Sequence, residues 1–386
     1  MNKKLKSPEQ IFLFKKDELL KDWEKHYTNM PEYNNSEIDG AEITCKFKFR
    51  CKDDYEDFKE KVKKYIYNGE KFIDGNQSET EKQSWYPLIE KTSNYFYSGN
   101  KHPRFPLYII SKGRYKKNPT SKILNKMNVK YKVIVEKNEY NLYKKIINEK
   151  NLLILPDEYK KKYDTFWNDK DLQTGSGPAR NFAWDHSIKQ GFDYHWVLDD
   201  NIESFVRFNN NKKIQCFSGD PFYILEDFIL RYTNIVISGF NYANFLHWHE
   251  FRPPIKFNTR VYSCLLINNK LPLRWRGRYN EDTDLCIRAL KMGYCTLLTN
   301  FFLQGKMSTM KMKGGNTTTI YVNGTKEKSQ MIEDMHPDIC RVAWKFNRWH
   351  HHCDYKKFKN NKPILKIDET NLKNINNYSM ILTKKN

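Results

Sequence analysis

The sequence predicts an α/β protein built on a doubly wound, mostly parallel sheet, with a small α+β module at its N-terminus. Two observations lead to this fold class. Short apolar runs typical of buried strands alternate with helical patterns, and they lie at residues 107–110, 131–136 and 151–156. A further apolar strand, 195–198, ends in the adjacent carboxylates Asp199 and Asp200. Open α/β sheets bind ligands at the carboxyl ends of their strands, so these acids are the first candidates for a functional site.

The chain is strongly basic. Its 386 residues include 67 Lys and Arg against 46 Asp and Glu, which gives a formal net charge of +21. This charge suits a polyanionic partner, although a genome composition that favours Lys and Asn codons explains it equally well. No stretch of about 18 apolar residues is present to span a bilayer, and the first apolar run is too short for a signal peptide. We therefore expect a soluble protein of the cytoplasm, not secreted and without a membrane partner.

The cysteines are scattered along the chain without CxxC pairs, and most of them lie in apolar surroundings. This distribution predicts reduced, buried thiols in a cytoplasmic protein. The eight residues are Cys45, Cys51, Cys216, Cys264, Cys286, Cys295, Cys340 and Cys353.

The composition divides the chain into three parts. Residues 1–100 form a small α+β module, because 42–50 alternates like a half-buried strand and 52–67 has helical spacing. This module carries no catalytic constellation and is interpreted as an accessory unit. The main domain is expected over residues 105–355 and a basic tail over 356–386. The C-terminal stretch from residue 341 onward, with eleven Lys and Arg against three Asp and Glu, is either a DNA-contacting surface or simply solvated.

In the main domain, the strand 107–110 is followed by Ser111 and Arg114 in a Gly-containing turn, where a first strand commonly meets a nucleotide. This signal is weak alone, because a Gly turn after a strand is common. The stretch 175–201 is more specific. Its Gly-rich start leads into a helix with Pro178 near the first helical position, which Gly191 closes before the strand ending in Asp-Asp.

The two carboxylates at the end of that strand are too costly to bury for packing alone, so a divalent cation or a polyhydroxylated ligand is their natural partner. Arg180 and Asn181 follow about one turn into the preceding helix. A surface pairing of Arg180 with Asp185 is the competing explanation, and the downstream acids favour a functional role.

A second acidic motif, Glu281-Asp282-Thr-Asp284, begins a helix that Gly293 ends. The three acids either complement the positive end of the helix or provide a catalytic base. Capping statistics alone favour the structural role about two to one. Combined with the Asp-Asp strand, the motif favours catalysis, with Asp282 as the base.

The segment before this motif alternates arginines with aromatic residues, namely Arg274, Trp275, Arg276 and Arg278. Such a pattern suits phosphate contacts and stacking on an extruded base. An equally weighted interpretation is that Trp275 fills the core and the arginines are solvated. The Gly- and Thr-rich residues 305–325 are expected to form a lid.

The segments GPARNFAW, WVLDDNI and NEDTDLCIRAL, in this order, resemble the TET-associated glycosyltransferases of phages and other viruses. That family is similar to nucleotide-sugar transferases of the GT-A fold and is thought to glycosylate oxidised methyl groups on DNA bases. The resemblance covers residues from about 105 to 355. It implies that Asp199 and Asp200 belong to the D-x-D element of the family, with Asn201 departing from its third position.

The resemblance also implies roles for individual residues. Contacts to a UDP-sugar donor would come from Ser111, Arg114, Gly177, Arg180, Asn181 and Asp199. Ligands for Mn²⁺ or Mg²⁺ would be Asp199, Asp200 and one of His351 or His352. Catalysis would rest on Asp282, with Glu281 and Asp284 behind it, and DNA would contact Arg274, Trp275, Arg276 and Arg278.

The sequence thus leads to the hypothesis of an inverting, metal-dependent transferase that moves a sugar from a UDP-sugar to the hydroxymethyl group of 5-hydroxymethylcytosine in viral DNA. Two alternatives stay open. The same fold could act on a carbohydrate or protein acceptor, or it could be a non-catalytic DNA-binding scaffold. DNA binding that depends steeply on salt, together with turnover of the sugar donor, distinguishes DNA glycosylation from both alternatives.

Overall fold

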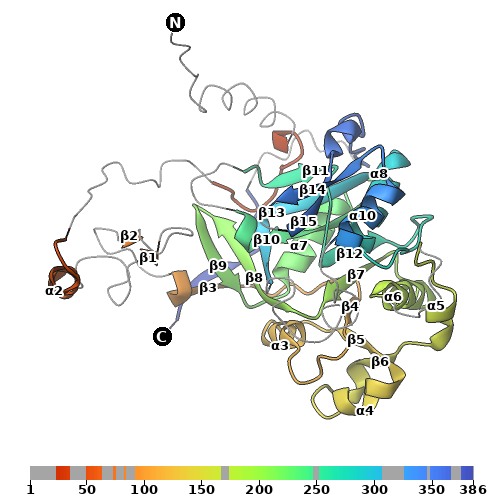
Figure 1. Cartoon of the computed structure of the whole chain (residues 1–386), viewed down its shortest axis with the longest axis horizontal. Coiled ribbons are helices and arrows are strands. Elements are labelled where there is room, and N and C mark those ends of the chain that lie inside the picture. Colours follow the sequence, from red (N-terminus) through yellow and green to blue (C-terminus); the bar gives the residue numbers. More distant parts are fainter. Residues whose placement is uncertain are drawn as a thin grey trace, which may run out of the picture.

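The computed structural model describes residues 23–34, 49–62, 73–74, 82–83, 92–166, 174–246, 252–306, 326–345, 348–366 and 375–385 (Figure 1). Most of the expected strand over 42–50 and most of the expected lid over 305–325 lie outside these residues. In the described part of the chain, no helix combines the length and the apolar character that crossing a bilayer requires.

A sheet of twelve strands forms the centre of the described residues (Figure 1). Across the sheet, the order is β16 (Ile381–Lys384), β3 (Tyr95–Ser98), β9 (Lys212–Cys216), β8 (Ile202–Asn209), β13 (Cys295–Lys306), β10 (Ile235–Tyr242), β12 (Cys264–Asn268), β7 (Tyr194–Asp199), β4 (Leu107–Ile110), β5 (Lys132–Val135) and β6 (Leu152–Ile154), and β11 (Ile255–Phe257) pairs with β13. Two small antiparallel pairs lie outside it, β1 (Ile73–Asp74) with β2 (Lys82–Gln83) and β14 (Cys340–Lys345) with β15 (Arg348–Cys353).

Helices pack on both faces of this sheet. The α-helices of the described residues are α2 (Lys52–Val62), α3 (Pro119–Lys126), α4 (Tyr140–Tyr143), α5 (Asp157–Lys161), α6 (Gly177–Lys189), α7 (Asp220–Ile229), α8 (Glu281–Lys291) and α10 (Lys326–Met335). One apolar core contains the buried side chains of α3 and α7, and a second contains those of α6 and α8. The two cores lie on opposite sides of the strands because successive strand residues face opposite ways. The expected doubly wound α/β fold is therefore confirmed.

The strands are mixed in direction. Strands β7, β4, β5 and β6 run parallel, and β10 runs parallel to β13, whereas β12 is antiparallel to both of its neighbours, β7 and β10. The chain proceeds outward from β4 to β5 and β6 and then returns to place β7 on the other side of β4. This reversal is a topological switch point, where open α/β sheets leave a crevice at the carboxyl ends of the strands.

Strand β7 is buried because its neighbours and helices cover both of its faces. Trp196 at its centre has no exposed surface and stacks on Phe240 with ring centroids 5.5 Å apart. The indole N–H donates to a carboxylate oxygen of Glu226 at 2.8 Å, so burial leaves no unmet donor there. Burying such an aromatic side chain stabilises the fold by about 1.5–3 kcal/mol. The site at the end of β7 is thus held by a rigid strand.

Residues 138–150 have helical spacing in the sequence, but only part of this stretch is helical in the structure. A 3-10 turn (Lys137–Glu139) leads into the single turn of α4, and no regular helix follows. Tyr143 is fully buried and its hydroxyl group lies 2.6 Å from Ser111 Oγ. Tertiary contacts of this kind override helix propensity.

Two segments that are far apart in the sequence pair at one edge of the central sheet. Strand β3, which lies within the expected N-terminal module, pairs with β16, which lies within the expected basic tail. Both strands are therefore part of the large sheet, and the division into parts at residues 100 and 356 remains a prediction.

The prediction that the cysteines are reduced, buried thiols is wrong for Cys340 and Cys353. These residues face each other across the β14–β15 ladder and form a disulfide. Cys51 is exposed, and four other cysteines are buried free thiols. Register across a hairpin brought the pair together, and the spacing of cysteines in the sequence did not reveal it.

Candidate active site

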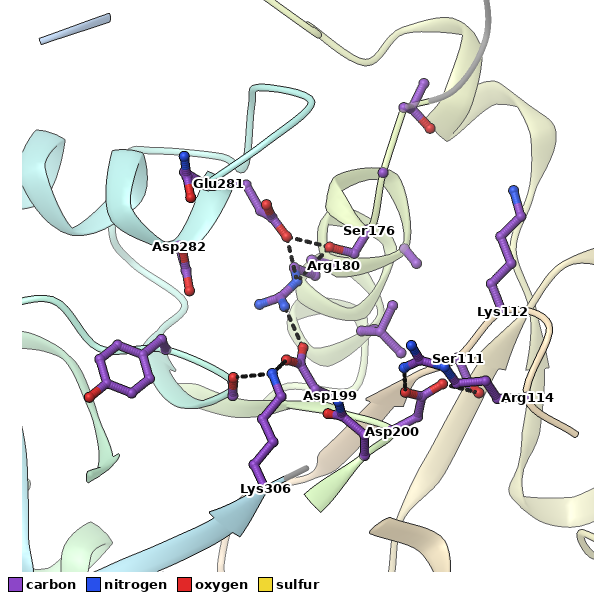
Figure 2. Close-up of a pocket in the computed structure, with 18 of the residues that line it drawn as sticks. Ser111, Lys112, Arg114, Ser176, Arg180, Asp199, Asp200, Glu281, Asp282 and Lys306 are labelled. Atoms are coloured by element: carbon purple, nitrogen blue, oxygen red, sulfur yellow. Dashed lines mark hydrogen bonds and ion pairs between the residues drawn. The ribbon is translucent and has the colours of Figure 1, made fainter. Parts of the chain in front are cut away.

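The candidate active site is a cavity of about 410 Å³ at the carboxyl ends of the strands around the switch point (Figure 2). Of the residues singled out in the sequence, those that line it are Ser111, Arg114, Arg180, Asp199, Asp200, Glu281, Asp282 and His351. Those that do not are Gly177, Asn181, Asp284, His352, Arg274, Trp275, Arg276 and Arg278. The structure therefore brings together residues from three motifs that are far apart in the sequence.

Asp200 lies against the turn after β4. Ile110 pairs with Asp199 in the β4–β7 ladder, so the residues that follow these two come side by side. Ser111 Oγ donates to Asp200 Oδ2 at 2.7 Å, and Arg114 Nη1 donates to Asp200 Oδ1 at 2.5 Å. Burial raises the pKa of Asp200, and the guanidinium of Arg114 opposes that rise. Both oxygens of this carboxylate are thus engaged by the β4 turn.

Asp199 turns to the other side of the strand end, toward two cations (Figure 2). Arg180 Nη2 donates to its Oδ1 at 2.7 Å, and Lys306 Nζ donates to its Oδ2 at 2.6 Å. Burial alone would raise the pKa of Asp199, but Lys306 and Arg180 outweigh it and hold the pKa well below the usual range. The same carboxylate raises the pKa of Lys306 against the opposing effect of burial. Both partners of the ion pair are therefore charged at neutral pH.

The acidic motif reaches the cavity from the start of α8. Asn280 precedes the helix in the left-handed region at φ +51°, which an asparagine tolerates, and Glu281 and Asp282 follow in the first turn. Glu281 accepts a hydrogen bond from Ser176, and its carboxylate lies 3.6 Å from Arg180 Nε. The backbone N–H of Thr283 donates to Asp282 Oδ1 at 2.7 Å. Glu281 thus orients Arg180, while Asp282 lines the cavity.

Several residues of the site were missed from the sequence. Lys306 is the last residue of β13, and Ser263, which receives a 2.7 Å hydrogen bond from Lys306 Nζ, immediately precedes β12. Arg260 and Tyr242 also line the cavity. One signal could have revealed Lys306, because the largely apolar stretch 297–303 is followed by Gln-Gly-Lys in the same way that 195–198 is followed by Asp-Asp. Asp199 ends β7 and Lys306 ends β13, and these two strands run in the same direction.

The cavity has an excess of positive charge and unmet hydrogen-bonding groups. Eight lysines and arginines line it, against five aspartates and glutamates. Arg180 Nη1 and Asn201 Oδ1 are buried without a hydrogen-bond partner among the described residues. A buried polar atom without a partner in the protein is available to a water molecule or a ligand. A guanidinium N–H in this position suits an anionic oxygen.

The expected metal ligands do not converge. Asp199 and Asp200 turn to opposite cations, His351 Nε2 lies 3.1 Å from Arg260 Nη1, and His352 does not line the cavity. Across the residues that the structure describes, no group of three His, Cys, Asp or Glu side chains could hold a metal ion. A divalent cation at Asp199 would also stand beside the charged groups of Lys306 and Arg180. The described donor set does not fit Mn²⁺ or Mg²⁺.

The remaining sequence candidates have structural contacts. Trp275 is 1% exposed and packs under the guanidinium of Arg180, 4.7 Å from its ring centroid, so its ring is closed to a base. Asn181 holds this segment through hydrogen bonds with the Trp275 backbone at 2.9 and 3.0 Å. Gly177 packs against the Tyr163 ring, where a Cβ atom would clash. These residues support the position of Arg180.

Asp284 faces away from the cavity into a buried ionic cluster. It receives hydrogen bonds from Arg288 Nε at 2.7 Å and Arg276 Nη2 at 3.1 Å, and it lies 2.9 Å from His336 Nε2. Burial would raise its pKa, but His336 and the two arginines lower it. The charged carboxylate therefore stabilises the fold at neutral pH, and this contribution disappears as the pH falls through its depressed pKa.

Replacing Asp284 with asparagine is expected to lower the free energy of unfolding by about 3–5 kcal/mol, because the change leaves buried cations uncompensated. Urea unfolding followed by circular dichroism measures this loss. The matched control is Asp338→Asn, whose partner Lys291 lies 2.7 Å away at an exposed site and whose loss should cost about 1 kcal/mol or less. Equal unfolding midpoints for the two variants would contradict the assignment.

The fold and the site together define a class of protein. An open α/β sheet with paired carboxylates, cations and a further carboxylate around its switch point has the layout of an enzyme acting on a nucleotide-linked substrate. Residues 105–315 match the model of the family described as TET-Associated Glycosyltransferase, and the chain belongs to this family. The protein is accordingly a glycosyltransferase. None of the curated proteins compared with the chain matches it.

Proposed function

We propose that the protein transfers a sugar from a UDP-sugar to the hydroxymethyl group of 5-hydroxymethylcytosine in viral DNA, with inversion at the anomeric carbon. The observation that carries this proposal is the arrangement of Asp282, Lys306 and Arg180 around one cavity beneath the switch point. The family supports sugar transfer, and the cavity supplies a carboxylate and cations of the kinds that the reaction requires.

The two ends of the cavity suit the two ends of a nucleotide-sugar. Near β5 and β6 the wall includes the apolar residues Ile134, Val135 and Leu155, against which a nucleoside can pack. Toward α8 the wall carries Arg260 and Lys306. A diphosphate of about two negative charges placed between these ends would complement the positive excess of the cavity.

The chemical step is a single displacement. Asp282 accepts the proton of the attacking hydroxyl group while the hydroxyl oxygen bonds to the anomeric carbon. The bond between that carbon and the diphosphate oxygen breaks, and the electron pair leaves with the diphosphate. Arg180 Nη1 and Lys306 Nζ stabilise the charge that develops there. Attack opposite the leaving group inverts the anomeric configuration.

These steps assign no task to a metal ion. A divalent cation would supply Lewis-acid stabilisation of the leaving diphosphate in related chemistry. Because Lys306 and Arg180 already flank Asp199, we assign that stabilisation to the two side chains.

We expect sugar transfer to persist in excess EDTA, since the cations of the cavity belong to the protein. Initial rates measured with protein first dialysed against the chelator, with and without added Mn²⁺, test this expectation. A loss of activity that Mn²⁺ restores would instead support the metal-dependent hypothesis.

Mass spectrometry of nucleosides tests the proposed function as a whole. DNA containing 5-hydroxymethylcytosine is incubated with the protein and a panel of UDP-sugars, and Asp282→Asn protein serves as the control. A hexose or pentose mass shift on the modified cytosine, absent with the variant, is expected. Hydrolysis of a UDP-sugar without any shift in DNA would point to a carbohydrate or protein acceptor.

A further inference from the structure

A second, larger cavity adjoins the candidate active site and is called the basic groove below. Its volume is about 1380 Å³, above the roughly 300–1,000 Å³ typical of pockets for small molecules. One wall is β11 with the residues that follow it, and the other is the β14–β15 hairpin with the 3-10 turn Tyr355–Phe358. The size and the open form suit a polymer better than a metabolite.

The charge of the basic groove is almost entirely positive. Arg252, Lys256 and Arg260 line one wall, and Arg341 with the four lysines between 356 and 362 line the other. Asp338 and Asp354 are its two acids. Asp338 pairs with Lys291, and Asp354 accepts a hydrogen bond from the Lys356 backbone at 3.1 Å. Cations on both walls, with both acids already engaged, are the electrostatic pattern of a polyanion site.

The basic groove opens into the active site at a cluster of aromatic residues. Phe245, Arg260, Tyr262 and His351 line both cavities. Phe245 is 51% exposed, and its ring centroid lies 5.2 Å from that of Tyr242 and 6.3 Å from that of Tyr262. An exposed ring beside cations is the arrangement on which nucleic-acid bases stack.

Arg260 links the two cavities electrostatically. Burial would lower its pKa, but the neighbouring Tyr355 and Asp282 raise it. The guanidinium therefore lies within the field of the proposed base while also bordering the basic groove. A phosphate bound there would bring its own nucleotide close to Asp282.

We propose that the basic groove binds the phosphate backbone of the acceptor DNA and that Phe245 stacks on the base that carries the acceptor hydroxyl. This inference rests on the proposed function and adds the acceptor site to it. The site differs from the expected Arg274–Arg278 segment, in which Trp275 is buried and Arg276 pairs with Asp284. To stack on Phe245 at the entrance of the active site, the acceptor base has to leave the helical stack of the duplex.

Binding of labelled duplex DNA containing 5-hydroxymethylcytosine tests the backbone contacts. Fluorescence anisotropy is measured for the full chain between about 50 and 200 mM salt, where phosphate contacts dominate the salt dependence. The variant Lys356→Gln/Lys359→Gln/Lys362→Gln should bind more weakly, and its salt slope should fall by about 0.9 for each phosphate that the protein no longer neutralises. The control Lys122→Gln/Lys126→Gln/Lys130→Gln removes the same charge from exposed lysines at α3 and after it, and it should change neither quantity.

The variant Phe245→Ala tests the stacking interaction. The KM for DNA should rise by about 5- to 150-fold, the range expected when stacking on one base is removed, while the affinity for UDP measured by calorimetry stays unchanged. Retention of UDP binding also shows that each variant is folded.

Two results overturn the inference, and they differ from failure of the proposed function. The triple lysine variant could keep the salt slope of the wild-type protein while it still transfers sugar to DNA. In that case the DNA phosphate backbone binds outside the basic groove, and the proposed function is unaffected. If Phe245→Ala keeps the KM for DNA, the base does not stack there. Absence of any transfer to DNA by the unchanged protein would reject the acceptor itself.

Discussion

Replacing Asp282 with asparagine is expected to lower kcat by about 10²–10⁴-fold, the contribution of a positioned general base. Asparagine has nearly the same shape and can keep the 2.7 Å hydrogen bond from the Thr283 backbone, but it cannot take up the hydroxyl proton. Single-turnover transfer at saturating donor measures the effect. UDP affinity should be unchanged, because the cations that face the diphosphate remain.

The matched control is Asp157→Asn, because Asp157 also lies in the first turn of a helix but lines neither cavity. The Asp157→Asn variant should keep the kcat of the wild-type protein. If Asp282→Asn transfers sugar within threefold of that rate, Asp282 is not the base, and Glu281, held by Ser176 and Arg180, becomes the next candidate.

The variant Lys306→Met is expected to lower kcat/KM for transfer by about 10²–10³-fold, the effect of removing one preorganised donor from a developing oxyanion. The side chain stays near its natural length and gives up only its charge and hydrogen bonds. The ammonium group now bridges Asp199 Oδ2 and Ser263 Oγ, at 2.6 and 2.7 Å, so its position is fixed before the donor binds. Steady-state kinetics over a range of UDP-sugar concentrations measure the decrease.

Removal of this ammonium also leaves Asp199 with one cation instead of two, so stability has to be followed alongside activity. The double variant Asp199→Asn/Lys306→Met removes the unpaired carboxylate and should recover thermal stability without recovering activity. Lys270→Met is the control, because Lys270 lies just after the end of β12 and pairs with Asp193 at 3.2 Å but lies outside both cavities. Full activity of Lys306→Met would reject the assigned role.

The sequence predicted the part of the site that depends on strand ends. Ser111 and Asp200 meet because both follow parallel neighbouring strands, a consequence of fold class and apolar pattern alone. The acidic start of α8 was likewise found from its sequence. Helix and strand periodicity thus specified which residues reach the carboxyl ends of the sheet.

The residues that escaped prediction depend on contacts between distant segments. The residues 305–325 were expected to form a lid, and Lys306 was included in it, although the strand β13 continues to Lys306. The sequence equally supported Trp275 as a residue that stacks on a base and as a core residue. The guanidinium of Arg180 covers its ring, so Trp275 is a core residue. Burial of a single aromatic side chain is a tertiary property, which local sequence does not encode.

Sheet pairing between β3 and β16 has a practical consequence for work with shortened chains. Strand β16 covers the side of β3 that faces away from β9. A version of the protein that stops before residue 381 would present the backbone N–H and C=O groups of β3 to solvent, and such groups recruit strands from other molecules. Truncation at this point would therefore favour self-association, and an affinity tag is better placed where it leaves the last strand free to pair.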